Sequence, residues 1–263
     1  MIIDTHTHLD NEKYYDDVEV VIKRAHENGV NQFIIPAADP KDITRAIELA
    51  QKYYEIYFAV GVHPIDVEKY DDKYLLDYIN HPKCVAVGEI GLDYHYTKET
   101  KEAQIEIFKK QLDIAIKYNK PVIIHIREAT HDSFLILDEY VKKYPDLKGV
   151  LHCFNADEEL LKLQNNFYYG IGGVLTFKNA KKLINVFPKI PKNRVIIETD
   201  SPYLTPHPFR GQRNEPSYTT LVRDKIAELW EVSKTEVEDI TTKNAKELFN
   251  IWKNIFYSFL FLH

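Results

Sequence analysis

Eight short apolar runs, separated by longer segments of helical periodicity, constrain the fold of this chain more than any other feature of the sequence. The runs are almost continuously apolar, as in the segments FIIP, VIIH and VIIE, and do not alternate between apolar and polar residues. This pattern is typical of strands that are buried on both faces. The expected strands span 1–4, 32–36, 57–62, 85–88, 122–125, 149–152, 168–171 and 195–198.

The segments between these runs repeat apolar residues at a spacing of three or four. In 17–28, for example, Val18, Val21, Ile22 and Ala25 share one helix face, and Gly29 follows where a helix-ending glycine is common. Further helices are expected over 99–118, 132–143, 177–187, 216–232 and 234–253. Strand followed by helix, repeated along the chain, predicts a parallel sheet with right-handed crossovers.

A closed barrel and an open doubly wound sheet both satisfy this alternation. The 263 residues of the chain match the length of one barrel, which is typically about 250 residues, and eight strands within that length favour the barrel. We therefore expect an α/β protein with a single (β/α)₈ TIM barrel over 1–253 and an apolar tail over 254–263. The tail reads IFYSFLFL over 255–262, and it could pack on the barrel, anchor at an interface or bind a partner.

Charge and cysteine usage exclude several classes of protein. A net charge of -6 and a pI near 6.0 exclude a stable, broadly basic DNA-binding surface, although nucleic acid remains possible as a substrate because a bound metal supplies positive charge locally. Cys84 and Cys153 lie far apart, which argues against a disulfide framework or a thiolate zinc site. The sequence shows no signal-peptide pattern and no transmembrane segment, so we expect a cytoplasmic protein.

Metal-binding side chains follow the expected strands, at the end where TIM barrels carry their active sites. Asp4, His6 and His8 alternate at the end of the first strand, where residues i and i+2 point the same way. Later strands are followed by further histidines and carboxylates: His63, Glu89, His125, His152 and Asp200. Such a set of residues at one barrel mouth predicts a metal site.

The six predicted ligands exceed the four of a single zinc site and fit two metal ions that share a bridge. We expect one ion between His6, His8, Asp200 and Glu89, and the other between Glu89, His125 and His152. Two ions about 3.5–4 Å apart can activate a shared water and stabilise both oxygens of a phosphoester displacement. Glu89, as the bridge, and Asp200, as the general base, are the candidate catalytic residues. The histidines suit zinc, manganese, iron or nickel better than magnesium, which prefers oxygen ligands.

Three arginines are candidates for substrate binding. Arg127 lies two residues after His125, so it could grip a phosphate or form an ion pair with a loop carboxylate. Arg210 and Arg213 follow the last strand, where TIM barrels often bind phosphate. The alternative for Arg213 is an ion pair with Glu215 that holds the loop.

The remaining polar residues near the predicted site are assigned supporting roles. His63 is expected to contact the substrate or its leaving group. Asp4 and Glu198 are expected to hydrogen-bond the metal ligands without binding metal themselves. Asp93, which lies near Glu89 in the sequence, is expected to be structural.

Seven segments, in order along the chain, resemble the TatD family of metal-dependent deoxyribonucleases. They are DTHTHLD (4–10), GVHP (61–64), VGEIGLDY (87–94), HIREA (125–129), the strand end at His152, ETDSPYL (198–204) and PFRGQRNEP (208–216). The resemblance implies an amidohydrolase-like TIM barrel, two divalent ions (Zn, Mn or Mg) and hydrolysis of DNA phosphodiesters. Members of this family are described as magnesium-dependent 3′-to-5′ exonucleases that act on single-stranded or damaged DNA, which implies a role in DNA repair.

Three other functions compete with this interpretation. One is a different amidohydrolase reaction on a lactone, amide or phosphotriester, but many such barrels bridge their metals with a carboxylated lysine where this chain has Glu89. Another is hydrolysis of the aminoacyl ester of tRNA, since some TatD-like proteins resemble D-aminoacyl-tRNA deacylases. The last is a non-catalytic metal-binding or scaffold protein.

We expect a monomer. We also expect the preferred DNA to be single-stranded or frayed, because a stiff duplex would not reach a concave site.

Overall fold

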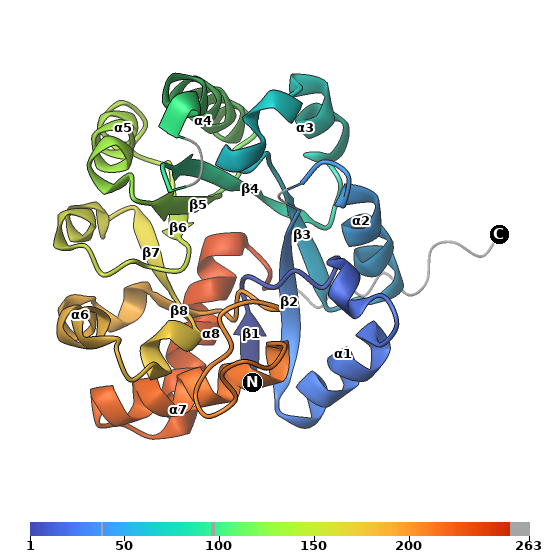
Figure 1. Cartoon of the computed structure of the whole chain (residues 1–263), viewed down its shortest axis with the longest axis vertical. Helices are drawn as coiled ribbons and strands as arrows, with labels where there is room; N and C mark the ends of the chain where they lie inside the picture. The colour runs from blue at the N-terminus through green and yellow to red at the C-terminus, as the bar shows by residue number, and fades with distance from the viewer. Residues whose placement is uncertain (38, 96–97, 253–263) are drawn as a thin grey trace.

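Eight parallel strands form the barrel of this protein in the computed structural model, which describes residues 1–37, 39–95 and 98–252 (Figure 1). Each strand pairs with the next one along the chain, in the order β1 to β8. The strands are β1 Ile2–Asp4, β2 Val30–Ala37, β3 Ile56–Val60, β4 Cys84–Asp93, β5 Val122–Arg127, β6 Gly149–Leu151, β7 Phe167–Ile171 and β8 Val195–Ile197. The expected TIM barrel is confirmed, with a strand at each of the eight predicted places.

Helices surround the strands on the outside of the barrel, except for the last one, which lies across one end (Figure 1). They are α1 Val18–Glu27, α2 Ile43–Lys52, α3 Asp72–Tyr78, α4 Lys101–Lys117, α5 Thr130–Lys143, α6 Lys181–Val186, α7 Thr219–Trp230 and α8 Lys234–Phe249. Helices α2 and α3 were not predicted from the sequence. The helix expected over 177–187 is the short α6, and the one expected over 216–232 starts with a 3₁₀ turn, Pro216–Tyr218, before α7.

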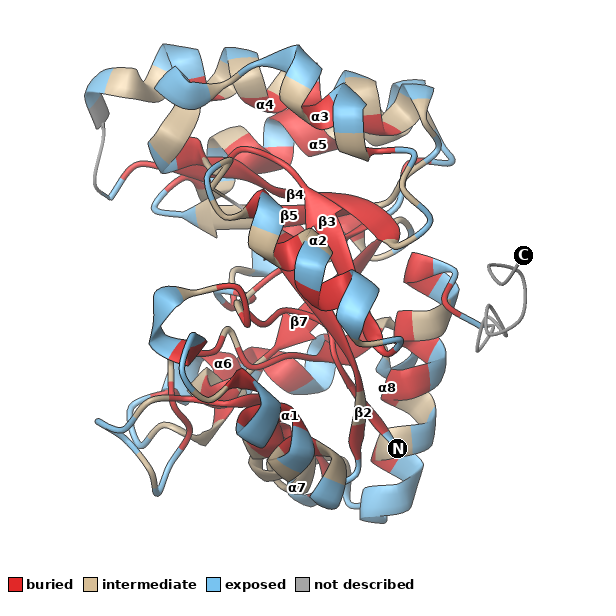
Figure 2. Ribbon diagram, turned by 90° about the vertical axis from the view of Figure 1, so that its right-hand side faces the viewer, coloured by how far each residue is buried: buried red, intermediate tan, exposed pale blue. Residues whose placement is uncertain are grey.

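One end of the barrel is closed by α8. Leu248 and Phe249 of α8, together with Ile251, pack against inward-facing residues that come from every strand of the barrel, such as Ile3 and Ile34. Figure 2 shows α8 beside the amino terminus, on the side of the barrel where the strands begin. A second core, which contains most of the remaining buried apolar residues, fills the space between the strands and the outer helices. The opposite end, where the strands finish, is left for the site.

The helix that was expected to reach residue 253 ends earlier, because Asn250 adopts the left-handed conformation, with φ of 53°, directly after Phe249. The predicted apolar tail over 254–263 lies outside the described residues, so the division of the chain at residue 253 stays a prediction. Among the residues that the structure describes, no helix has both the length and the apolar character needed to cross a membrane.

Candidate metal centre

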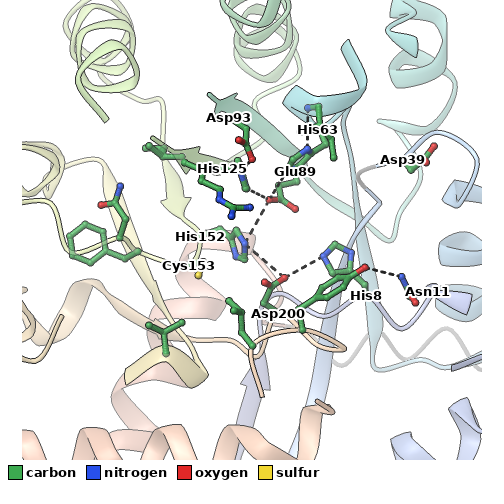
Figure 3. A pocket seen from close by; sticks show the side chains of 18 of the residues that line it. His8, Asn11, Asp39, His63, Glu89, Asp93, His125, His152, Cys153 and Asp200 are labelled. Carbon is green, nitrogen blue, oxygen red and sulfur yellow. Dashed lines mark hydrogen bonds and ion pairs between the residues drawn. The ribbon is translucent and has the colours of Figure 1, made fainter. Parts of the chain in front are cut away.

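A cavity of about 920 Å³ lies at the end of the barrel where the strands finish. The residues predicted from the sequence line it from different strand ends, and Figure 3 shows that their side chains point toward one another. Those that line the cavity are His8, His63, Glu89, His125, His152 and Asp200. His6 is 1% exposed and lies within ion-pair distance of this group. The structure therefore brings all six predicted ligands together.

Glu89 lies at the centre of the cluster. Its Oε1 is 2.7 Å from Nδ1 of His125, 3.6 Å from Nε2 of His63 and 3.7 Å from Nε2 of His152, while its Oε2 is 3.3 Å from Nε2 of His6. Burial raises the pKa of Glu89, but the surrounding histidines outweigh burial and bring that pKa well below its usual range. The carboxylate is therefore ionised, and its two oxygens face different histidines, as the predicted bridge requires.

Asp200 faces the histidines of the first strand. Its Oδ1 lies 3.5 Å from Nε2 of His8, 3.7 Å from Nε2 of His6 and 4.0 Å from Nε2 of His152. Burial raises the pKa of Asp200, but His8, His152 and His6 together lower it below its usual value. Asp200 is thus a carboxylate at neutral pH, with the charge that a metal ligand or a general base needs.

His6 is the clearest sign that the cluster is built for a cation. Both ring nitrogens of His6 are buried, and neither has a hydrogen-bond partner among the described residues. Burial lowers the pKa of His6, so its imidazole is neutral and offers a lone pair. A buried polar atom without a hydrogen-bond partner lowers the stability of the folded protein, unless a bound ligand such as a metal ion contacts that atom. The group His6, His8 and Glu89 offers ligand atoms close enough together to hold one ion.

His63 lies among the predicted metal ligands. Its predicted contact with the substrate stays a prediction, and its Nε2 lies 3.6 Å from Oε1 of Glu89. His63, Glu89 and His125 form a second group whose ligand atoms could hold an ion. Burial lowers the pKa of His63 to about 3, which leaves the imidazole neutral. His63 was predicted to follow a strand but was not counted among the six ligands, because its distance from Glu89 depends on the path of the loop.

Three buried carboxylates hold the histidines in place. Asp93 Oδ2 lies 3.0 Å from Nε2 of His125, and Glu198 Oε1 lies 3.1 Å from Nδ1 of His152. Asp4 accepts hydrogen bonds from the backbone N–H of His6 and from the Thr199 hydroxyl, at 3.3 and 2.6 Å. Such contacts fix the orientation of a ligand and raise its basicity. Glu198 also forms, with His6 and His152, a group whose ligand atoms could hold an ion, so the supporting roles of Asp4 and Glu198 stay predictions.

The protonation of the remaining histidines reflects the negative charge around them. Burial lowers the pKa of His152, but Glu198, Glu89 and Asp200 outweigh burial and raise it to about 10. Burial likewise opposes a charge on His8 and His125, yet Asp200 raises the pKa of His8, and Asp93 and Glu89 raise that of His125. In the metal-free protein, protons on these three histidines thus balance the negative charge of the carboxylates. Bound metal ions would supply that positive charge in place of the protons.

The predicted substrate-binding arginines are not equally close to the cavity. Arg127 ends β5 and lines the cavity. Arg210 is not among the cavity-lining residues. Its Nη1–H donates to the backbone O of Thr205 at 2.8 Å, and its guanidinium lies 4.0 Å from the ring centroid of Phe177.

Arg213 is likewise not among the cavity-lining residues. It forms an ion pair with Asp17 at 2.6 Å, whereas Glu215 pairs with Arg24 at 2.7 Å. The alternative ion pair between Arg213 and Glu215 is therefore wrong. Arg213 and Glu215 lie in the loop between β8 and α7, whereas Asp17 precedes α1 and Arg24 lies within it. The two ion pairs therefore join this loop to α1. The structure does not bring Arg210 or Arg213 to the site, and their role as substrate contacts stays a prediction.

Comparison with known proteins agrees with this geometry. The family described as TatD related DNase matches residues 3–250. This chain belongs to the TatD family. Members of the family are hydrolases that act on ester bonds, and so is this protein.

Several relatives within the TatD family match the chain over nearly its whole length. The uncharacterized metal-dependent hydrolase YabD of Bacillus subtilis is 46% identical over 256 residues, which cover 95% of this chain and 100% of YabD. The uncharacterized metal-dependent hydrolase YcfH of Escherichia coli K12 is 37% identical, with 95% and 96% covered. The crystal structure of YjjV, a TatD homolog from Escherichia coli K12, superposes with a TM-score of 0.89 at 32% identity, covering 95% of this chain and 98% of YjjV.

Proposed function

We propose that this protein is a metal-dependent deoxyribonuclease that removes nucleotides from DNA in the 3′-to-5′ direction. The observation that carries the proposal is the convergence of histidines on the ionised carboxylate of Glu89, with both nitrogens of buried His6 unsatisfied. The family match supports DNA as the substrate, since the family is described as a DNase. The relatives YabD and YcfH are both named as metal-dependent hydrolases.

The donor set fits two divalent ions that share Glu89. His6, His8 and Asp200 would hold one ion, and His125 and His152, with His63 within reach, would hold the other. When bound, zinc, manganese or magnesium ions would supply positive charge for the phosphate and lower the pKa of a nearby water. Histidine nitrogens favour zinc or manganese over magnesium.

The residues of the chain supply the remaining parts of the reaction. Asp200 is ionised and partly open to the cavity, so it can accept the proton of the attacking water. Arg127 lines the same cavity, where a guanidinium can hold a phosphate oxygen of the substrate. Together these two side chains would orient the attacking water and the substrate within this cavity.

The shape of the site supports a preference for single strands and frayed ends. Glu89 is only 4% exposed, and it lies below the loops that rim the cavity. A base-paired end would have to open before a phosphodiester reached that depth, and unpairing costs about a few kcal/mol.

We also propose that the protein is a monomer in a reducing cytosol, where Cys84 and Cys153 are free thiols. Its proposed activity would give it a part in DNA repair.

The direct test follows the cleavage of end-labelled single strands. The protein is stripped of metal, reloaded separately with zinc, manganese or magnesium, and incubated with the same strand labelled at its 5′ or 3′ end. We expect activity only after reloading, a ladder that shortens from the 3′ end, and slower cleavage of blunt duplex. Release of amino acids from charged tRNA without any cleavage of DNA would overturn the proposal in favour of the deacylase.

A further inference from the structure

Tyr203 is a large aromatic side chain that remains exposed at the rim of the cavity. It is 47% exposed and lines the cavity, whereas most other large apolar side chains in the described part of the chain are buried in one of the two cores. It lies three residues after Asp200, and its backbone N–H donates to the backbone O of Asp200 at 2.8 Å. The ring is therefore held close to the candidate general base while one part of it faces solvent.

The contacts of Tyr203 orient the ring and leave nearly half of the residue exposed. Its hydroxyl accepts a hydrogen bond from Nδ2 of Asn11 at 3.4 Å, and its ring meets the imidazole of His8 edge to face, with 6.1 Å between centroids. The backbone O of Tyr203 accepts a bond from Nδ2 of Asn214 at 2.6 Å. Nζ of Lys13, an exposed residue, lies 5.1 Å from the ring centroid. The ammonium group of Lys13 thus lies over one face of the ring, next to the cavity that Tyr203 lines.

We propose that Tyr203 is a stacking platform for the nucleobase next to the scissile phosphate, and that Lys13 contacts the flanking phosphate. This inference rests on the proposed function and names the part of a DNA strand that the rim recognises. Aromatic rings paired with cationic side chains bind single strands in this way, because every base has a π face and every linkage a negative charge. A base within a duplex has both faces covered by its neighbours. Stacking on Tyr203 therefore selects unpaired bases of any sequence.

Binding measurements test the stacking role separately from cleavage. The probes are a fluorescein-labelled single strand with hydrolysis-resistant phosphorothioate linkages and a matched strand whose terminal nucleotides are abasic. We expect the metal-loaded protein to bind the base-containing strand about 10-fold more tightly than the abasic one. Tyr203→Leu, which keeps apolar volume but removes the ring, should abolish this ratio. Tyr203→Phe, which keeps the ring and loses only the hydroxyl, should preserve it.

The matched control is Tyr54→Leu, because Tyr54 is 74% exposed and does not line the cavity. This variant should bind both strands as the parent does. Metal content and the midpoint of thermal unfolding are measured for each variant, so that a disturbed His8 or a misfolded barrel is recognised. With a cleavable strand, Tyr203→Leu should raise KM about 10-fold and change kcat little, since the ring does not touch the reacting atoms.

Equal binding of the two strands by the parent protein would overturn the inference, whatever the variants do. An equal loss of affinity for both strands in Tyr203→Leu would overturn it too, because a merely structural role predicts that result. The proposed function can fail independently. If no strand is cleaved but base-dependent binding requires Tyr203, the nuclease proposal fails and the stacking platform stands. If strands are cleaved without base-dependent binding, only the stacking platform fails.

Discussion

Glu198→Gln should weaken metal binding without unfolding the barrel. Glu198 is 1% exposed, its Oε1 lies 3.1 Å from Nδ1 of His152, and the same oxygen accepts the backbone N–H of Cys153 at 2.6 Å. The position is tightly enclosed, since a Cβ added at Gly170 would lie 2.2 Å from Oε2. Glutamine has the same length and retains one acceptor oxygen, but it removes the charge that faces His152.

The size of the effect follows from the role of that charge. A carboxylate behind a histidine fixes its tautomer and its orientation, and losing such a partner typically costs about 10- to 100-fold in metal affinity. This loss corresponds to about 1.4–2.8 kcal/mol of binding free energy. The affinity is measured by competition with a chromogenic zinc chelator at fixed pH. Thermal unfolding of the metal-free variant checks that the fold is intact.

The matched control for this variant is Glu159→Gln. Glu159 also faces a histidine, at 3.3 Å from Nδ1 of His131, but the side chain of His131 is 70% exposed and the pair lies outside the cavity. An exposed pair of this kind contributes little, so metal affinity should not change. If Glu198→Gln binds zinc within twofold of the parent, Glu198 does not position His152 and the reasoning is refuted.

Four further predictions concern the ligands themselves. Glu89→Gln should lose most activity and part of the metal content; full activity with two bound metals would contradict the bridge. Asp200→Asn should lower turnover by about 10²-fold or more while the ion at His125 and His152 stays bound and DNA affinity changes little, and turnover within a few-fold of the parent would exclude Asp200 as the base. Because the pKa of His152 is raised from 6.5 to about 10, the metal must displace a proton, so apparent affinity should rise up to about tenfold per pH unit between pH 6 and 8. Calorimetry in two buffers measures that proton, and a pH-independent affinity would contradict it. In the metal-free protein the same shift adds stability that is complete below about pH 6.5 and is lost as the pH rises toward 10.

The strands of this fold were predictable because burial on both faces leaves a continuous apolar signal. The two helices that were missed differ in the strength of their signals. In α2 the buried residues Ile43, Ala46, Leu49 and Ala50 follow helical spacing, so this helix was predictable from the sequence. In α3 only Leu75 is buried along seven residues, so no period is visible. A short helix with one buried anchor is defined by its tertiary contact and not by its pattern.

The site was predictable to the extent that strand ends determine it. Because parallel strands deliver their carboxyl ends to one mouth, the residues after each strand could be brought together without knowledge of the loops. The distance from His63 to Glu89 depends on the path of a loop, and the partner of Arg213, Asp17, lies 196 residues away in sequence. Such pairings follow from the closed barrel and leave no local pattern in the sequence.

The barrel is closed where the chain after β1 pairs with the chain after β8, a contact that we call the seam. The residues of this seam include the candidate ligands His6, His8 and Asp200. Strands β1 and β8 are only three residues long, and the chain continues the pairing beyond them. The backbone N–H of Asp200 donates to the backbone O of His6 at 2.9 Å, and that of His8 donates to the backbone O of Ser201 at 2.8 Å. Closing the barrel and assembling His6, His8 and Asp200 are therefore a single structural event.

Because these bonds use the backbone, a changed side chain at Asp200 leaves the seam closed. Asp4 differs, since its own carboxylate joins the two strands by accepting the Thr199 hydroxyl and the Thr199 N–H, at 2.6 and 3.0 Å. A substitution at Asp4 would disturb the seam and the position of His6 together, and its effect on activity could not be assigned to chemistry. A substitution at Asp200 changes the proposed chemistry and leaves the backbone bonds of the seam in place. Asp200, and not Asp4, is therefore the informative residue for testing the reaction.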